Sequence, residues 1–362
     1  MTDFKAEPEE LFQRELAAVE RVLRSGWYVL GKEVQAFEAA WAKACGVAHA
    51  VGVGNGMDAL EIGLRARDIG PGDEVITTSM TAFATTLAIL RAGAVPVLAD
   101  IDPETALLDP LSVERCITPR TRAVLLVHLY GHVHQMDRWT QLCRDKNLLL
   151  LEDCAQAHLA VWEGRPAGSF GAWGAFSFYP TKNLGAVGDA GMLVTDDHGT
   201  ARRARSLRNY GQSERYHHTE RGLNSRLDEL QAALLMERLT WLERFTNRRR
   251  EVADAFYAGF HNPLVRALPR PHHRDNHVHH LFVVRCDRRE ELSAFLRTRA
   301  VESLIHYPVP VHRQEPCTLL GRDPHGLART EAHATHCLSL PCHPQLTDEH
   351  VCRVIDAVNA FH

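Results

Sequence analysis

The sequence has no long hydrophobic run, no internal repeat and no low-complexity segment. None of its apolar stretches approaches the ~20 residues that a membrane-spanning helix requires. The N-terminal segment 1–23 is charged and amphipathic, and it lacks the apolar stretch of a secretory signal peptide. These absences predict a protein that is not secreted and has no membrane partner.

Two further absences concern charge and cysteine pairing. The formal net charge is −4 with neutral histidine, so no basic field is present to attract nucleic acid. The cysteines number nine, an odd count, and form no CxxC pair. We therefore expect reduced thiols, a cytoplasmic location and no nucleic-acid partner.

Metal-binding motifs are also missing, although the chain has 22 histidines. HExxH does not occur, and the histidine-rich run His272–His280 has no second cluster at zinc-finger spacing. A solvated loop that leads into the strand-like segment 281–286 explains this run without a metal. The sequence therefore predicts no metal site.

What the sequence does contain is an alternation of strand-like and helical segments. Apolar runs of about five residues, separated by helical patterns, are typical of parallel strands buried on both faces of a sheet. The strand-like runs are 49–54, 73–78, 95–101, 121–130 and 148–153. We predict an α/β fold, in which a mostly parallel central sheet is flanked by helices.

The length of the chain predicts more than one core. Its 362 residues exceed a single ordinary core, so a second domain is expected. Apolar residues recur at helical spacing through Ser225–Phe260, which predicts a long helix that bridges two domains. The pattern after residue 262 indicates a compact α+β unit. We place the boundary near residue 247, which gives a large domain 1–247 and a smaller C-terminal domain 248–362.

The first candidate for a binding site is a turn between a strand and a helix. Ligands of open α/β sheets bind beyond the carboxyl ends of the strands, so residues directly after strands are candidates. In Gly52–Leu60 a glycine-bearing turn opens a helix whose first N–H groups can bind phosphate. Helix capping by Asn55 or Asp58 is the alternative. The segment is not a P-loop, because GxxxxGK[ST] is absent.

A carboxylate ends another apolar strand, at Glu152-Asp153. Such a carboxylate is poorly solvated, so it needs a cation or N–H groups as partners. A helix cap is the structural alternative. Gln156, three residues further on, could bond a ligand or complete a capping arrangement.

Lys182 follows the strand-like run 172–178 on a glycine-rich turn. No helix or strand face is available along which its side chain could reach solvent. Burial lowers the pKa of a lysine from about 10.4, and the neutral amine can then bond to a carbonyl carbon. The glycines would let the backbone approach a flat ligand closely, and Ser177 could donate to an anion.

Asn224 and Ser225 are a further candidate pair, because the helical pattern places them at a helix start. A helix start can bind an anion, although capping alone explains both residues equally well. Together with the three sites above, they match the requirements of pyridoxal phosphate. A lysine holds its aldehyde, a carboxylate pairs with its ring nitrogen, and helix-start amides hold its phosphate. We therefore expect Lys182 and Asp153 to be catalytic, with Lys182 as the proton carrier.

Motifs along almost the whole chain resemble the DegT/DnrJ/EryC1/StrS family, the sugar aminotransferases of aspartate-aminotransferase fold type I. These motifs are SGWYVLGKEVQAFEAAWA, GNGMDAL, AGAVPVLADID, VHLYGH, EDCAQAH, SFYPTKNLGAVGDAGML, GLNSRLDELQAA, IHYPVPVH and CLSLPCHP. Several are long, ordered and specific to the family. The resemblance implies an enzyme that uses pyridoxal 5'-phosphate.

The resemblance also implies a role for individual residues. Lys182 matches the lysine that holds the aldehyde, Asp153 matches the partner of the ring nitrogen, and Gln156 matches a contact to the ring oxygen. The matching phosphate contacts are Gly56, Met57, Ser177 and Asn224. In the family the asparagine comes from the neighbouring subunit, which implies a homodimer with shared active sites. The positions that match the sugar pocket, or lie near it, are Tyr179, Arg215, His306 and Tyr307.

Two positions depart from the family pattern. The family often has an aromatic ring directly after the threonine of its T-aromatic-x-A-T motif, stacked on the cofactor. Here Ala82 occupies that position and Phe83 follows, so either Phe83 turns inward or the stacking is weaker. At position 57 the family often has threonine, whereas Met57 offers only its backbone N–H group.

By this resemblance, the expected reaction moves an amino group from L-glutamate to a nucleotide-linked keto-sugar. GNGMDAL together with the segments around Arg215 and Asn224 is most similar to the branch that aminates C3 of a dTDP-3-keto-6-deoxyhexose. Amination at C4 of an NDP-4-keto-6-deoxyhexose is one alternative. A non-catalytic regulator that binds pyridoxal phosphate is the other. Lys182, Asp153 and the matching sugar-pocket residues favour an enzyme.

Overall fold

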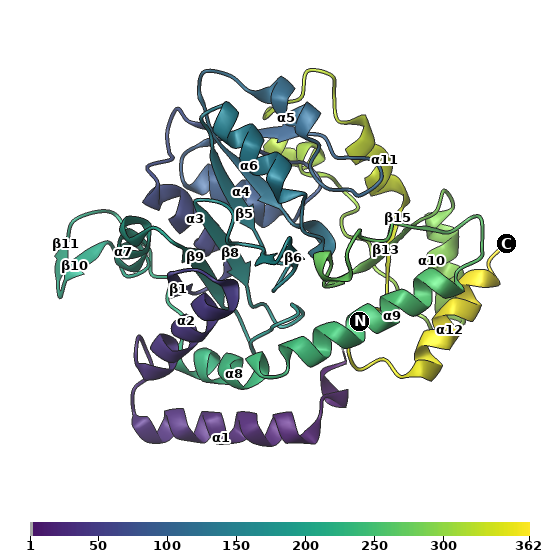
Figure 1. The fold of residues 1–362 in the computed structure, drawn as a ribbon, viewed down its shortest axis with the longest axis horizontal. Helices are drawn as coiled ribbons and strands as arrows, with labels where there is room; N and C mark the ends of the chain where they lie inside the picture. Colours follow the sequence, from purple (N-terminus) through teal and green to yellow (C-terminus); the bar gives the residue numbers. More distant parts are fainter. Residues whose placement is uncertain (1–2) are drawn as a thin grey trace.

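A mostly parallel sheet of eight strands forms the centre of the protein, in a computed structural model that describes residues 3–362 (Figure 1). The strand order is β1-β9-β8-β5-β4-β2-β3-β14. Pairs from β8 to β14 are parallel, whereas β9 is antiparallel to β1 and β8. The strands are β1 (His49–Val53), β2 (Glu74–Thr78), β3 (Val95–Ala99), β4 (Thr121–Val127), β5 (Leu149–Asp153), β8 (Trp173–Ser177), β9 (Gly191–Thr195) and β14 (Gly321–Arg322).

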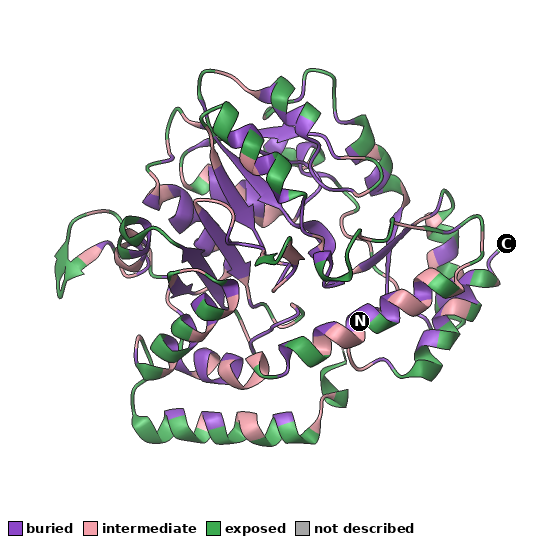
Figure 2. Cartoon of the chain, viewed as in Figure 1, coloured by how far each residue is buried: buried purple, intermediate pink, exposed green. Residues whose placement is uncertain are grey.

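Helices cover both faces of this sheet, and its strands consist largely of buried residues (Figure 2). Apolar residues of α2, α5, α6 and α8 share one core with the sheet, and those of α3, α4 and α7 share another. These helices are α2 (Lys32–Cys45), α3 (Gly56–Ala66), α4 (Phe83–Arg91), α5 (Pro110–Cys116), α6 (Met136–Asp145), α7 (His198–Leu207) and α8 (Glu229–Leu239). The predicted α/β fold with a flanked, mostly parallel sheet is confirmed.

A separate core lies near the C-terminus, around a three-stranded antiparallel sheet. Its elements are β12 (Arg266–Ala267), β13 (Phe282–Arg285), β15 (Cys337–Leu340), α9 (Leu242–Gly259), α10 (Arg289–Thr298) and α12 (Asp348–Asn359). The remaining α-helices and strands are α1 (Glu9–Ser25), β6 (Val161–Trp162), β7 (Arg165–Pro166), β10 (Gln212–Glu214), β11 (His217–His218) and α11 (Ala328–His336). No helix within residues 3–362 is both long and apolar enough to cross a membrane.

The helical pattern of Ser225–Phe260 is divided between two helices, so the prediction of one long helix is wrong. The first helix, α8, begins at Glu229, and α9 begins at Leu242. Asn224 and Ser225 therefore do not start a helix. The Ser225 N–H group donates to the Arg208 carbonyl at 2.9 Å, and Asn224 forms a β-bridge with Asn209. These tertiary bonds hold the segment extended.

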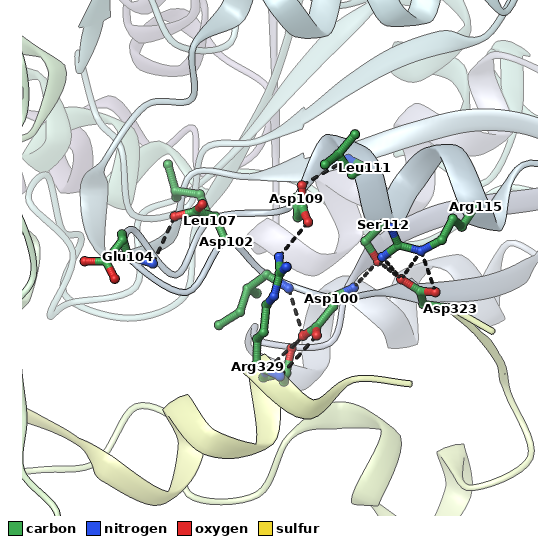
Figure 3. A network of polar contacts seen from close by, with 12 residues as sticks. Asp100, Asp102, Glu104, Leu107, Asp109, Leu111, Ser112, Arg115, Asp323 and Arg329 are labelled. Carbon is green, nitrogen blue, oxygen red and sulfur yellow. Dashed lines mark hydrogen bonds and ion pairs between the residues drawn. The ribbon is translucent and has the colours of Figure 1, made fainter. Parts of the chain in front are cut away.

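A polar network attaches the segment from β14 to the start of α11 to the large sheet and to α5 (Figure 3). The Asp323 carboxylate, next to β14, accepts hydrogen bonds from Arg115 and Ser112 of α5. The guanidinium of Arg329, at the start of α11, pairs with the Asp109 carboxylate at 2.8 Å. The backbone N–H group of Arg329 donates to the Asp100 carboxylate at 3.1 Å. Charged hydrogen bonds thus fix a C-terminal segment on the large sheet.

These connections bear on the predicted domain boundary. Helix α9 continues through residue 247 without a break, and the first residue of the C-terminal core is Val252. Strand β14, which lies in the predicted small domain, pairs with β3 of the large sheet. The division into 1–247 and 248–362 remains a prediction.

Part of the histidine-rich run is buried, which corrects the prediction of a solvated loop. His277, His279 and His280 are buried, whereas His272 and His273 are exposed. The rings of His277 and His279 stack with their centroids 3.9 Å apart, and His280 bonds Asn183 at 3.2 Å. Burial lowers the pKa of all three buried histidines, so they pack as neutral rings.

Candidate active site

Several polar residues gather where parallel strands of the large sheet end. Asp153 is the last residue of β5, and Ser177 is the last residue of β8. Lys182 lies on the turn after β8, where its N–H group donates to the Tyr179 carbonyl at 2.8 Å. Since β5 and β8 are parallel neighbours, their carboxyl ends bring these side chains to one edge of the sheet.

Asp153 is a buried carboxylate with donors on both oxygens. Only 5% of the residue is exposed. Its Oδ2 accepts from the Thr85 hydroxyl at 2.8 Å, and its Oδ1 accepts from the Ala155 N–H group at 3.1 Å. Burial raises the pKa of Asp153, while these two donors and the charges of Lys182 and His128 oppose that rise.

Lys182 experiences the complementary effect. Burial disfavours its ammonium form and lowers the pKa of Lys182 to about 8, although the negative charge of Asp153 opposes the shift. The turn after β8 brings Lys182 to the edge where the neighbouring strand β5 ends with Asp153, and the opposite charges of the two residues act on each other. An amine with this pKa is about one tenth neutral at pH 7, far more than an ordinary lysine, and the neutral amine is the nucleophile.

The start of α3 forms a close contact with the end of β8. Asn55 caps the helix, because its side chain accepts from the Asp58 N–H group at 2.8 Å. A β-carbon on Gly56 would lie 2.6 Å from the Ser177 β-carbon, so only glycine fits there. Free N–H groups of the first helical turn and the Ser177 hydroxyl therefore lie side by side, a donor set suited to phosphate.

Gln156 connects the sheet edge with the segment that contains His306 and Tyr307. Its amide donates to the Tyr307 hydroxyl at 3.3 Å, and its carbonyl accepts from the Tyr130 N–H group at 2.6 Å. Burial and the charge of Asp153 raise the pKa of Tyr307 to about 12. Burial and Lys182 lower the pKa of His306, whose Nδ1 bonds Ser339 at 2.9 Å.

The comparisons with known proteins identify the family of the chain. The sequence model of the DegT/DnrJ/EryC1/StrS aminotransferase family matches residues 9–359. The chain belongs to this family. The resemblance stated from the sequence motifs is thereby confirmed.

Individual relatives cover nearly the whole of this family member. It is 48% identical over 360 residues to "dTDP-3-amino-3,4,6-trideoxy-alpha-D-glucose transaminase" of Streptomyces venezuelae, covering 99% of this chain and 95% of that protein. It is 44% identical to "dTDP-3-amino-3,6-dideoxy-alpha-D-galactopyranose transaminase" of Aneurinibacillus thermoaerophilus, covering 97% and 96%. The crystal structure of S. venezuelae DesV in complex with a ketimine intermediate superposes with a TM-score of 0.94 at 47% identity, covering 99% and 96%.

Some expected site residues of this DegT/DnrJ/EryC1/StrS aminotransferase lie apart from Lys182. Arg215 is at the tip of the β10–β11 hairpin, which projects from the body beyond α7 (Figure 1), and it bonds only its neighbour Tyr216 within residues 3–362. The exposed Asn224 side chain makes no hydrogen bond within the same residues. Tyr179 is 52% exposed. Tyr179 contacts Lys182 through its backbone carbonyl, whereas no hydrogen bond within residues 3–362 joins Arg215 or Asn224 to Lys182.

The position of Phe83 bears on whether its ring turns inward toward the cofactor site. Phe83 is the first residue of α4 and packs against Leu98, Val311, Cys317 and Leu327. Ala82, directly before it, has no aromatic ring to offer. Met57 is partly buried and packs against the core of α3, α4 and α7, so it leaves only backbone N–H groups for a phosphate.

Four residues near the site were not identified from the sequence. The Thr85 hydroxyl donates to the Asp153 carboxylate, and the His128 N–H group donates to the Asp153 carbonyl at 3.1 Å. The Tyr130 N–H group donates to the Gln156 side chain, and the His158 ring bonds the Ser177 carbonyl at 2.9 Å. Each lies within a motif that carries the family resemblance or within the segment Thr81–Thr85. The partners of these residues come from other parts of the sequence, so periodicity could not indicate them.

One compact group of metal-type ligands lies behind the site, among residues 3–362. His128, Glu152 and Cys154 are buried within 4.8 Å of one another. The Glu152 oxygens already accept from the N–H groups of Gly168, Phe170 and Gly171, and from His128 at 3.1 Å. Burial and nearby carboxylates raise the pKa of the Cys154 thiol well above its usual value. This group is a satisfied hydrogen-bond centre.

Proposed function

We propose that the protein is an aminotransferase that uses pyridoxal phosphate to move an amino group from L-glutamate to a nucleotide-linked keto-sugar. The observation that carries the proposal is the placement of Lys182, with its lowered pKa, beside the ionisable Asp153 at the end of β5. The start of α3 and Ser177 supply donors for a phosphate at the same edge. The residues present therefore fit this cofactor.

When bound, pyridoxal phosphate would supply an aldehyde carbon that takes up the amino group and a ring that accepts an electron pair. In this proposal the Lys182 amine would hold the aldehyde and then move a proton at the substrate carbon. Asp153 would accept a hydrogen bond from the protonated ring nitrogen, and Gln156 would bond the ring oxygen. Gly56, Met57 and Ser177 would bind the phosphate.

The proposed sugar pocket lies on the side of His306 and Tyr307. Amination at C3 of a dTDP-3-keto-6-deoxyhexose is supported by the names of the two relatives, both of which are dTDP-3-amino-sugar transaminases. Lys182 and Asp153 favour turnover over a regulator that merely binds the cofactor. Phe83, expected as a ring contact, is engaged with a separate apolar cluster, which favours weaker stacking.

The test is incubation of the holoenzyme with L-glutamate and, in parallel, 3-keto and 4-keto dTDP-6-deoxyhexoses. We expect an amino-sugar product and 2-oxoglutarate from the 3-keto substrate, identified by mass and by the position of the amino group. Amination of the 4-keto substrate alone would replace the C3 assignment. Bound cofactor without product from either sugar would favour the regulator.

We further propose a homodimer in which each site is completed by the partner. Asn224 and Arg215 are exposed, and so are large apolar side chains such as Trp27, Tyr179 and Tyr216. Exposed apolar residues of this size are typical of an interface. We expect a mixture of Lys182→Ala and Asn224→Asp subunits, refolded together, to recover part of the activity that each variant lacks. No recovery in heterodimers verified by mass would count against shared sites.

A further inference from the structure

The Asp153 carboxylate is held by a side chain of another element. Thr85 lies in the first turn of α4, and its hydroxyl is 2.8 Å from Asp153 Oδ2. The hydroxyl of Thr81 is 2.8 Å from that of Thr85. Thr81 is 4% exposed, Thr85 is 0% exposed and Asp153 is 5% exposed, so little water reaches the three groups.

The direction of both hydrogen bonds follows from chemistry. An ionised carboxylate has no proton and only accepts, so the single Thr85 proton points to Asp153. The Thr85 oxygen can then only accept from its other neighbour, which makes Thr81 the donor. Two aligned hydroxyls thus form a chain that ends on the carboxylate, and each bond polarises the next.

The two hydroxyls of Thr81 and Thr85 oppose the effect of burial on the pKa of Asp153. The titratable groups around this carboxylate are Lys182, His128, Tyr307 and Cys154. Burial favours the neutral acid, whereas donors to the carboxylate favour the anion. The Ala155 N–H group holds the other oxygen, so the two donors also fix the rotation of the carboxylate.

We infer that Thr85 is a positioning residue that keeps Asp153 ionised and correctly oriented toward the ring nitrogen of bound pyridoxal phosphate, and that Thr81 orients Thr85. This inference rests on the proposed function, which makes Asp153 the partner of that nitrogen. Thr85 does not touch the reacting atoms in this assignment. It acts through the carboxylate alone.

The chain offers a matched set of variants for the test. Thr85→Val keeps the shape and removes the hydroxyl, and Thr85→Ser keeps the hydroxyl. Thr86, the next residue of α4, is equally buried, and its hydroxyl has no hydrogen-bond partner within residues 3–362. Thr86→Val is therefore the control for a methyl group that replaces a hydroxyl in this helix.

The measurement is the dissociation constant of pyridoxal phosphate for each cofactor-free protein, by spectral titration across a pH series. Loss of a hydrogen bond to a charged group predicts binding weaker by roughly tenfold to a hundredfold in Thr85→Val. The acidic limb of the binding profile should move up by about one pH unit, because Asp153 protonates more readily. Thr85→Ser should bind within about threefold of the wild type, and Thr86→Val should match the wild type.

The outcomes separate this inference from the proposed function. If the wild type binds pyridoxal phosphate and Thr85→Val has the same affinity and acidic limb as Thr86→Val, the role of Thr85 is refuted. If Thr85→Ser is as weak as Thr85→Val, packing and not the hydroxyl is responsible, and the inference also fails. Should Thr85→Val not fold, Thr81→Val must show a smaller shift in the same direction. If the wild type did not bind the cofactor, the proposed function would be refuted instead.

Discussion

At the scale of single residues, burial acts in opposite directions on the base and the acid of the site. It lowers the pKa of Lys182 to about 8 and raises the pKa of Asp153. Each charge partly protects the other, so neither side chain pays the full cost of leaving water. The result is an amine that can lose its proton near physiological pH beside a carboxyl that stays ionisable.

The lowered pKa of Lys182 predicts how the cofactor-free protein reacts with pyridoxal phosphate. Only the neutral amine bonds to the aldehyde, so the rate of this reaction should rise with pH around a midpoint near 8. The change in absorbance after rapid mixing, followed over a pH series, gives this midpoint.

Lys182→Ala is the control for this measurement. It should remove the phase with the midpoint near 8. If the variant kept a phase with this midpoint, the reaction would not be that of Lys182.

At the scale of elements, the approach of α3 to β8 sets the shape of the proposed phosphate site. The two elements meet at Gly56 and Ser177, with no room for a β-carbon between them. The helix start is thereby held against the strand end, and its N–H groups face the same edge as Asp153. A small change in this contact is expected to move the whole donor set.

Gly56→Ala tests this contact. The added β-carbon would lie 3.0 Å from the Ser177 α-carbon, so the backbone has to shift. We expect the unfolding free energy to fall by about 1–3 kcal/mol and the affinity for pyridoxal phosphate to fall at least about tenfold. Thermal melting and cofactor titration measure the two effects.

A second glycine serves as the control. A β-carbon on Gly321 would have its nearest neighbour at 3.7 Å, which is an ordinary contact. Gly321→Ala should therefore leave cofactor affinity and stability nearly unchanged. If the two variants behaved alike, the close contact of α3 with β8 would not control the site.

At the scale of the whole molecule, buried histidines make stability depend on pH. Burial lowers the pKa of His158 and His279 to about 3 and that of His333 to about 4. The unfolded chain binds protons at these residues below about pH 6.5, whereas the folded chain does not. Their contribution to stability is therefore present above that pH and is lost as the pH falls.

We expect the melting temperature to fall steeply below about pH 6.5, since each such histidine removes about 1.4 kcal/mol per pH unit. Circular dichroism or dye-based melting between about pH 8 and 5 measures the profile. In His279→Gln one histidine fewer takes up a proton on unfolding, so the melting temperature should fall less steeply as the pH falls. His350→Gln is the control, because His350 is exposed on α12 and should leave the slope unchanged. A flat wild-type profile would contradict the burial of these rings.

The sequence by itself determined the fold class and most of the proposed chemistry. Continuous apolar runs such as 148–151 are typical of strands that are buried on both faces, which predicts a parallel sheet. Ligand sites lie after such strands, so Asp153, Ser177 and Lys182 were identified as candidates from position and residue type alone. These signals are local, and each can be detected without knowing what packs on it.

Only the tertiary structure decided features that depend on contacts between distant segments. Helix α8 starts at Glu229 because Ser225 bonds Arg208, a partner that no periodicity indicates. His277 and His279 are buried by packing, although their segment looks polar. Thr85 meets Asp153 because α4 begins at the edge where β5 ends. The physical reason is common to all three: the free energy of a polar group is set by the partner that folding brings to it.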